Sequence, residues 1–254
     1  MKNGAAARSE ASSCAAASSR PRSGSPLETS ADRPVTSVNV RHRPRSVGLM
    51  RQADRAEETA RKLLEIPLPR RWAHTQGVAA QARTLAPILG ENADLLEAAA
   101  WLHDIGYSPD LAITGFHPLD GARYLRDHEH ADELLCRLVA HHSCAAIEAE
   151  ERDLAGDLIR AFPPPPRDVL DALTYCDMTV GPDGRELNVE TRLAEIRRRY
   201  GPSHVVSRAI GRASPRIIEA VYQVRAAIAL SGLRRTGNTV PEGDAVQRAD
   251  VHKR

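Results

Sequence analysis

The sequence predicts an all-α domain between two tails, on three observations. Apolar residues recur at helical spacing between residues 52 and 232, and no segment alternates apolar and polar residues as a strand would. Prolines and glycines fall where helices would begin and end. Alanine, leucine and arginine, which favour helices, dominate the composition. We therefore expect one helical domain over residues 51–232, with its core at 70–200, and disordered tails at 1–50 and 233–254.

The first helices are predicted from their ends. A helix at 52–65 is followed by one at 69–89, since Pro69 suits a first helical turn and Gly90 a stop. Asn92 can cap the next helix, which ends near Gly106. Pro118 opens a helix that continues over 119–127.

Apolar stripes and breakers predict the remaining helices. The expected ranges are 132–142, 147–162, 168–179, 189–200 and 203–230. The proline run at 163–166 and the turn at 181–184 separate three of them.

The two tails are predicted from composition. Residues 1–50 contain no Phe, Tyr or Trp and are rich in Ala, Ser, Arg and Pro, so they have little to bury. An organelle transit peptide, or translation that begins at Met50, would also fit this segment. Residues 233–254 hold Gly, Pro and charges without a periodic pattern.

Charge and cysteine content limit the classes of function. Residues 1–51 carry a net charge of about +6 and the remainder about −4. Such a basic tail is usually solvated, so we do not expect nucleic acid as a partner. The sequence has no apolar run of transmembrane length and no secretory signal, so we expect no membrane association. The 4 cysteines form no CxxC pair, which favours a reducing, cytoplasmic setting.

Histidines and aspartates in the predicted helices are the candidates for a functional site. They are His74 inside a helix, the pair His103-Asp104 at the end of an apolar helix, and Asp177 in a mostly apolar helix. A buried carboxylate needs a metal, an arginine or a hydrogen-bond network as its partner. Two imidazoles and two carboxylates form a mixed nitrogen and oxygen donor set, which suits iron, manganese, zinc, nickel or cobalt better than calcium.

The order of these residues resembles the HD superfamily of metal-dependent phosphohydrolases. The run His103-Asp104-Ile105-Gly106 matches the HDIG variant of its motif, with a helical His74 upstream and a helical Asp177 downstream. The resemblance implies an HD-type helical bundle in which these four residues bind one or two divalent ions of Mn, Fe, Ni, Co, Zn or Mg. It also implies that His103 and Asp104 are catalytic.

Further histidines resemble the ligands of the binuclear HD branches. By this resemblance Asp104 would bridge two ions, and His117, in His117-Pro118-Leu119-Asp120-Gly121, would bind the second. Either His141 or His142 would complete the second site. The family pattern favours His142, whereas one residue of slip in the helix would favour His141. Adjacent helical residues point about 100° apart, so we expect only one of them to reach the ion.

The reaction implied by this resemblance is hydrolysis of a phosphate mono- or diester of a nucleotide or other small phosphorylated metabolite. A divalent ion lowers the pKa of its bound water and so supplies hydroxide near neutral pH. Arg71 and Arg123 are candidates for phosphate contacts, chosen from their spacing to His74 and His117. Tyr107 stands where the HD-GYP branch usually carries lysine, and no Gly-Tyr-Pro motif follows, so cyclic di-GMP is not expected as the substrate.

Two other functions fit the same residues. Some HD proteins with the binuclear ligand set are di-iron oxygenases, for which iron-dependent oxygen consumption would be diagnostic. A non-enzymatic sensor or interaction domain stabilised by metal is the third candidate. The oligomeric state is open at this level.

Overall fold

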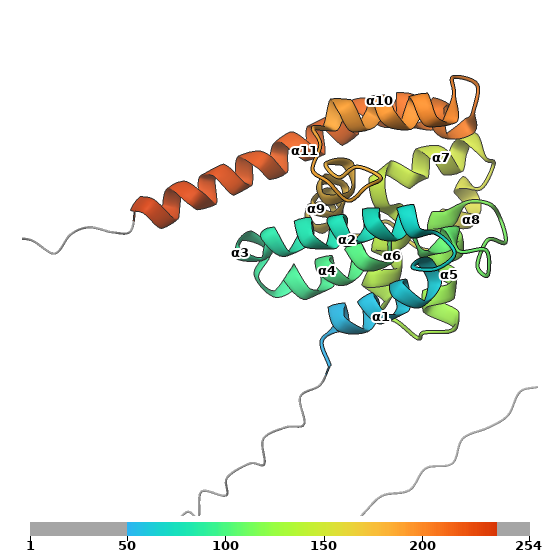
Figure 1. Ribbon diagram of the computed structural model, residues 1–254, viewed down its shortest axis with the longest axis horizontal. Helices are drawn as coiled ribbons and strands as arrows, with labels where there is room; N and C mark the ends of the chain where they lie inside the picture. Colours follow the sequence, from blue (N-terminus) through green and yellow to red (C-terminus); the bar gives the residue numbers. More distant parts are fainter. Residues whose placement is uncertain (1–49, 238–254) are drawn as a thin grey trace, which may run out of the picture. The chain divides into compact units, whose positions relative to one another are not determined.

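The computed structural model describes residues 50–237, with side chains described up to residue 232, and the all-α prediction is confirmed (Figure 1). Within this range an isolated bridge between Val180 and Glu186 is the one extended pairing. The helices are α1 (Gln52–Leu64), α2 (Pro69–Thr84), α3 (Ala86–Leu89), η1 (Gly90–Asn92), α4 (Ala93–Leu102), η2 (Ile105–Tyr107), α5 (His117–Asp127), α6 (Glu133–His141), η3 (His142–Cys144), α7 (Ala145–Glu151), α8 (Ala155–Ala161), α9 (Arg167–Met178), α10 (Val189–Tyr200) and α11 (Val205–Gly237).

Helix α4 lies in the centre of the domain and brings a polar pair into its interior. It packs against α1, α2, α6 and α9. Its residues from Leu96 to Leu102 are all buried, and the one charged residue among them, Glu97, is paired with Arg51 and Arg83. The ring of Trp101 stacks on Trp72 of α2, with ring centroids 5.4 Å apart. The backbone leaves α4 at His103 and Asp104, which are therefore held rigidly inside the core.

Most predicted helices are present, and two were predicted too long. The predicted helix at 147–162 is divided into α7 and α8, because Asp153 has a left-handed backbone (φ 60°). The predicted helix at 69–89 is interrupted at Leu85, shortly before Pro87, whose ring lacks the N–H that an uninterrupted helix would need.

Helix α11 runs to Gly237, past its predicted end at 230. The predicted tail at 1–50 lies outside the described residues except for Met50. The predicted tail at 233–254 lies outside them from residue 238 onwards.

Helix α6 begins with a cap that fixes the start of the segment leading to His142. Asp132 accepts hydrogen bonds from the backbone N–H groups of Leu134 (2.8 Å) and Leu135 (3.3 Å). We expect Asp132→Ala to lower the free energy of unfolding by about 1 kcal/mol, because those N–H groups lose their acceptor. Urea unfolding measures this effect. Asp132→Asn, which keeps an acceptor oxygen, should lose far less, and equal losses in both variants would contradict the capping role.

Candidate metal centre

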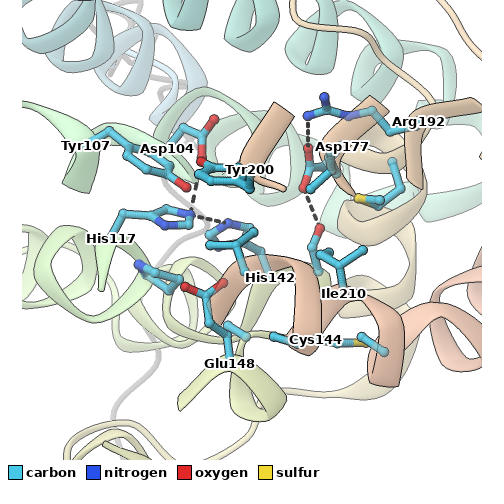
Figure 2. Close-up of a pocket in the computed structure, with 18 of the residues that line it drawn as sticks. Asp104, Tyr107, His117, His142, Cys144, Glu148, Asp177, Arg192, Tyr200 and Ile210 are labelled. Carbon is cyan, nitrogen blue, oxygen red and sulfur yellow. Dashed lines mark hydrogen bonds and ion pairs between the residues drawn. The ribbon is translucent and has the colours of Figure 1, made fainter. Parts of the chain in front are cut away.

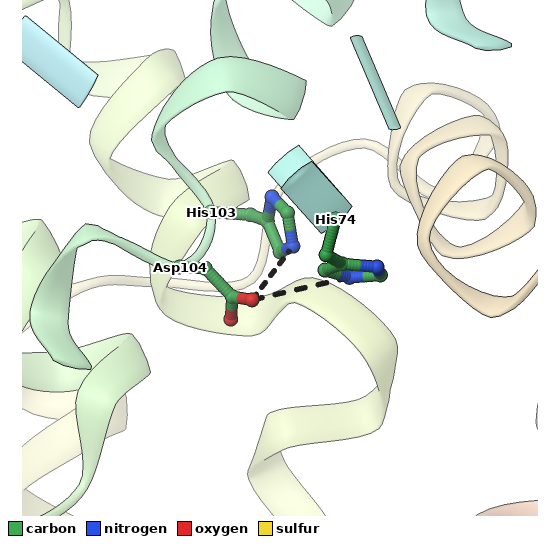
Figure 3. A group of neighbouring side chains, drawn as sticks. All are labelled: His74, His103 and Asp104. Atoms are coloured by element: carbon green, nitrogen blue, oxygen red, sulfur yellow. Dashed lines mark ion pairs between the residues drawn. The ribbon is translucent and has the colours of Figure 1, made fainter. Parts of the chain in front are cut away.

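Six polar residues from separate segments of the chain converge in the interior of the domain. Figure 3 shows His74, His103 and Asp104 side by side, and Figure 2 shows Asp104 next to His117 and His142 in the cavity that Asp177 also lines. They come from α2 (His74), the end of α4 (His103, Asp104), the start of α5 (His117), η3 (His142) and α9 (Asp177).

The first half of the cluster joins two imidazoles to two carboxylates. The Nε2 atom of His74 lies 3.0 Å from Oδ1 of Asp177 and 3.9 Å from Oδ2 of Asp104. The Nε2 atom of His103 lies 3.3 Å from Oδ2 of Asp104 and 3.9 Å from Oδ1 of Asp177. Among them, one ligand atom each of His74, His103 and Asp104 lies within 4.8 Å of the others, which is close enough to hold one metal ion (Figure 3).

The second half uses the other oxygen of Asp104. Its Oδ1 atom lies 3.4 Å from Nε2 of His117. That nitrogen lies 3.1 Å from Nε2 of His142 (Figure 2). Ligand atoms of Asp104, His117 and His142 could therefore hold a second ion. The carboxylate of Asp104 faces both halves, one oxygen to each, as a bridging ligand would.

Three of the four imidazoles are oriented by backbone carbonyls. Nδ1 of His74 donates to Gly181 O at 3.0 Å, Nδ1 of His103 donates to Ala100 O at 2.8 Å, and Nδ1 of His142 donates to Val139 O at 2.7 Å. A carbonyl oxygen can only accept, so each Nδ1 carries a proton, and in the neutral form of each ring Nε2 presents a free electron pair. This arrangement is typical of metal-binding histidines.

His117 is oriented by an aromatic contact instead. Its ring stacks on the Tyr107 ring, with the two centroids 3.8 Å apart. The guanidinium of Arg71 also packs on the Tyr107 ring, 3.6 Å from its centroid. The three groups form a stack beside Asp104, which Arg71 also contacts through Nη1 at 2.6 Å.

The two carboxylates are ionised. Burial alone would raise their pKa values, but cationic and imidazole neighbours hold the pKa of each well below its usual value. For Asp104 these neighbours are chiefly Arg71 and His103. For Asp177, His74 is the leading one.

The imidazoles are mostly neutral. Burial lowers the pKa of His74, His117 and His142, because a charged ring would lose its hydration. Burial would also lower the pKa of His103, but the adjacent Asp104 carboxylate raises it. Ionised carboxylates and neutral imidazoles are the forms that bind metal ions.

An unpaired buried nitrogen indicates that these residues fit a metal ion. Nε2 of His103 is fully buried and has no hydrogen-bond partner, although an unpaired buried polar atom is destabilising. It points at the two carboxylates, at distances a bound cation could bridge. The donor set of nitrogen and oxygen atoms, without thiolate, suits a transition-metal ion.

Glycines allow the close backbone approaches that set these distances. A Cβ atom on Gly77 would lie 2.4 Å from Gly184 O, so α2 and the loop after α9 can touch only because this position lacks a side chain. That loop carries the carbonyl of Gly181 that orients His74. A Cβ atom on Gly106 would lie 2.0 Å from His117 O, so Gly106 lets α5 start directly beside Asp104.

Some of the residues predicted to contact substrate or metal lie in the cluster, and others do not. Arg71 lies in the site, whereas Arg123 does not line the cavity that holds the cluster. Its position six residues after His117 places it about 240° around α5, so it faces away. His141 is also turned away, since its Nε2 donates to Phe162 O at 2.7 Å. His142 enters the cluster because the chain leaves α6 after His141.

Several residues of the site were missed by the sequence reasoning. Arg192 lies 3.7 Å from Oδ1 of Asp177 and 3.5 Å from Nε2 of His74, although it is only 4% exposed. Ser143 donates from Oγ to Oδ2 of Asp177 at 2.5 Å. The signal for Arg192 was its position on the apolar face of α10, beside Val189 and Leu193, where a solvated arginine would not fit.

The two adjacent histidines provide a matched test of the second site. We expect His142→Ala to lower the metal content by about one ion per chain, because its Nε2 faces His117 and Asp104. His141→Ala should leave the metal content unchanged, since its ring binds a backbone carbonyl. Elemental analysis of both purified variants measures this, and a loss of metal in His141→Ala alone would contradict the assignment.

Comparison with known proteins agrees with this geometry. Residues 71–194 match the family model described as HD domain. The chain therefore carries an HD domain, and the resemblance carried by His103-Asp104-Ile105-Gly106 is confirmed.

Two curated relatives share part of the chain. Ribonuclease Y of Fervidobacterium nodosum is 39% identical over 70 residues, which are 28% of this chain and 14% of that protein. Ribonuclease Y of Rubrobacter xylanophilus is 37% identical over 79 residues, which are 31% of this chain and 15% of that protein. No solved structure matches the chain significantly. Among the described helices, none combines the length and apolar character needed to cross a bilayer.

Proposed function

We propose that this HD domain is a metal-dependent phosphohydrolase with two divalent ions. The observation that carries the proposal is the division of the Asp104 carboxylate between two groups of imidazole Nε2 atoms. His74, His103 and Asp177 would complete the first ion's ligands, and His117 and His142 the second's. When bound, such ions neutralise phosphate charge and activate water for attack near neutral pH.

A cavity lies beside the cluster and is open to solvent. The space inside it, counted with the part that is open to solvent, is about 600 Å³. Asp104, His117, His142 and Asp177 line one side. Apolar residues of α9, α10 and α11 line the other, namely Met178, Ile196, Val206, Ala209, Ile210 and Ala213. A phosphate on the polar side and a base or other apolar group against these helices would fit this cavity.

Three arginines in the cavity would bind the phosphate. Arg71, Arg192 and Arg199 line this cavity with the metal cluster. Phosphoryl transfer depends mainly on positioning and on neutralising charge, which guanidinium groups do well because they bind two oxygens at once. In this role Arg192 and Arg199 replace Arg123 among the predicted phosphate contacts.

The ribonuclease matches support adding RNA to the proposed substrates. The printed name of both relatives is that of an enzyme acting on RNA. This similarity speaks against the prediction that nucleic acid is an unlikely partner. A small phosphorylated metabolite and a short oligonucleotide therefore both belong to the proposed substrates, in a protein proposed to act in the cytoplasm.

Turnover of a simple diester tests this function. Full-length protein loaded with Mn(II), Co(II), Ni(II) or Fe(II) should hydrolyse bis(p-nitrophenyl) phosphate, lose activity with EDTA, and regain it when metal is restored. A short oligoribonucleotide, tested in parallel, measures the nucleotide preference. No hydrolysis of any phosphoester, or iron-dependent oxygen consumption in its place, would overturn the proposal.

A further inference from the structure

A second cavity lies next to the metal centre and is lined by arginines. It measures about 740 Å³, including space open to solvent. Arg70, Arg71, Arg192 and Arg199 line it, together with His74, three prolines and one leucine. No acidic residue is among the side chains that line it. A concave surface of this composition favours an anionic ligand.

The two cavities share a wall. Arg71, Arg192 and Arg199 line both of them. Arg71 contacts Asp104, and Arg192 lies 3.5 Å from His74, so these arginines are directly adjacent to the proposed metal ligands. A ligand in the second cavity would therefore lie beside a phosphate bound at the metal centre.

The four arginines that line the second cavity lie near three carboxylates, those of Asp104, Asp177 and Glu195. Glu195 accepts from Arg192 at 2.7 Å and lies 3.6 Å from Arg199, so this carboxylate is shared by two guanidinium groups. Arg70 forms no ion pair in the described part of the chain. Nε of Arg192 is buried and has no hydrogen-bond partner. Positive charge and donor capacity are thus left for a ligand.

The start of helix α2 adds to this potential. Leu68 is its N-cap residue and makes no side-chain cap, and Pro69 stands in its first turn. Leu68, Pro69, Arg70 and Arg71 all line the second cavity. Free backbone N–H groups at an uncapped helix start attract anions, and this start belongs to a helix of 16 residues.

We propose that the second cavity binds a further phosphoryl group of the substrate while the scissile phosphate sits at the metal centre. The substrate class is then a nucleotide with at least two phosphoryl groups, such as a 5′-phosphorylated dinucleotide or the end of an oligonucleotide. Arg70 and Arg199 would bind the second group, and Arg71 and Arg192 would lie between the two. This inference rests on the proposed phosphohydrolase function.

Binding of matched dinucleotides tests the subsite without turnover. The first pair of probes is a phosphorothioate-linked adenosine dinucleotide with and without a 5′-phosphate, titrated calorimetrically into full-length, Mn(II)-loaded protein. We expect the 5′-phosphate to tighten binding by about tenfold, as a charge-assisted contact does. Arg70→Ala and Arg199→Ala should each remove most of this advantage. Arg198→Ala, an exposed neighbour on α10 that lines neither cavity, should retain it.

A second pair of probes distinguishes the source of the phosphoryl group. If the advantage appears between ADP and AMP and depends on Arg70, the subsite takes a directly adjacent phosphate. If it appears between the dinucleotides, the subsite takes a phosphate one nucleotide away. Equal affinities within both pairs, or an advantage that survives in Arg70→Ala and Arg199→Ala, would overturn the inference.

Failure of this inference is separable from failure of the proposed function. Protein that hydrolyses bis(p-nitrophenyl) phosphate but binds both members of each pair equally keeps the hydrolase and lacks the subsite. Protein that shows the arginine-dependent advantage without hydrolysing any phosphoester keeps the subsite and loses the hydrolase.

Discussion

Asp104→Asn is expected to remove both metal ions and to lower turnover by about a thousandfold or more. The carboxylate of Asp104 offers one oxygen to His74 and His103 and the other to His117. The uncharged amide of asparagine has the shape of the carboxylate, but it supplies neither the negative charge nor two equivalent oxygen ligands for the metal ions. A loss of about 4 kcal/mol in transition-state stabilisation corresponds to this factor.

Metal content and turnover of Asp104→Asn are measured on the same preparation. The control is Asp110→Asn, which removes one exposed carboxylate a few residues away and should leave both quantities unchanged. Circular dichroism checks that the helices remain. Two ions per chain in folded Asp104→Asn would contradict the bridging role.

Gly106→Ala is expected to destabilise the domain and to abolish the second metal site together. The added Cβ would lie 2.0 Å from His117 O and 2.7 Å from Gly121 N, so the start of α5 must move away. Because these neighbours are backbone atoms, they cannot rotate aside. Forced overpacking of this kind costs about 1–3 kcal/mol, and the displaced His117 would no longer reach the ion.

Urea unfolding and elemental analysis of Gly106→Ala measure the two effects. Gly211→Ala is the matched control, since a Cβ there would meet no atom within 4 Å and the position is helical. That variant should be as stable as the wild type or slightly more stable. Wild-type stability and two ions in Gly106→Ala would show that α5 can shift without consequence.

That His74, His103, Asp104 and Asp177 would need partners was predictable, because buried imidazoles and carboxylates are costly without them. Their candidacy as metal ligands came from the resemblance in chain order, and the structure brings them within reach of one another. The choice between His141 and His142 was not predictable from helical spacing. It depends on the end of α6 and on Ser143, whose left-handed backbone (φ 48°) ends regular helical geometry there.

Arg71 was predicted as part of the cationic wall from its spacing to His74, whereas Arg192 and Arg199 were missed because they follow the last candidate ligand, Asp177, on a separate helix. Arg192 and Arg199 lie on α10, and only the packing of α10 and α11 over the site brings them near α2. Arg123 was chosen from sequence spacing alone, which does not include the direction of its side chain. The break at Asp153 was missed because no proline or glycine stands there, although aspartate is among the residues that adopt a left-handed backbone more readily.

Metal content per chain in the wild type and in His117→Ala is the most direct test of the binuclear centre. The protein is purified without a histidine tag, loaded with Mn(II), and analysed for metal after desalting. The structure predicts about two ions per chain in the wild type and one in His117→Ala, because only the second site loses a ligand. One ion in both proteins would contradict the second site, and no ion in either would remove the basis for a metal-dependent hydrolase.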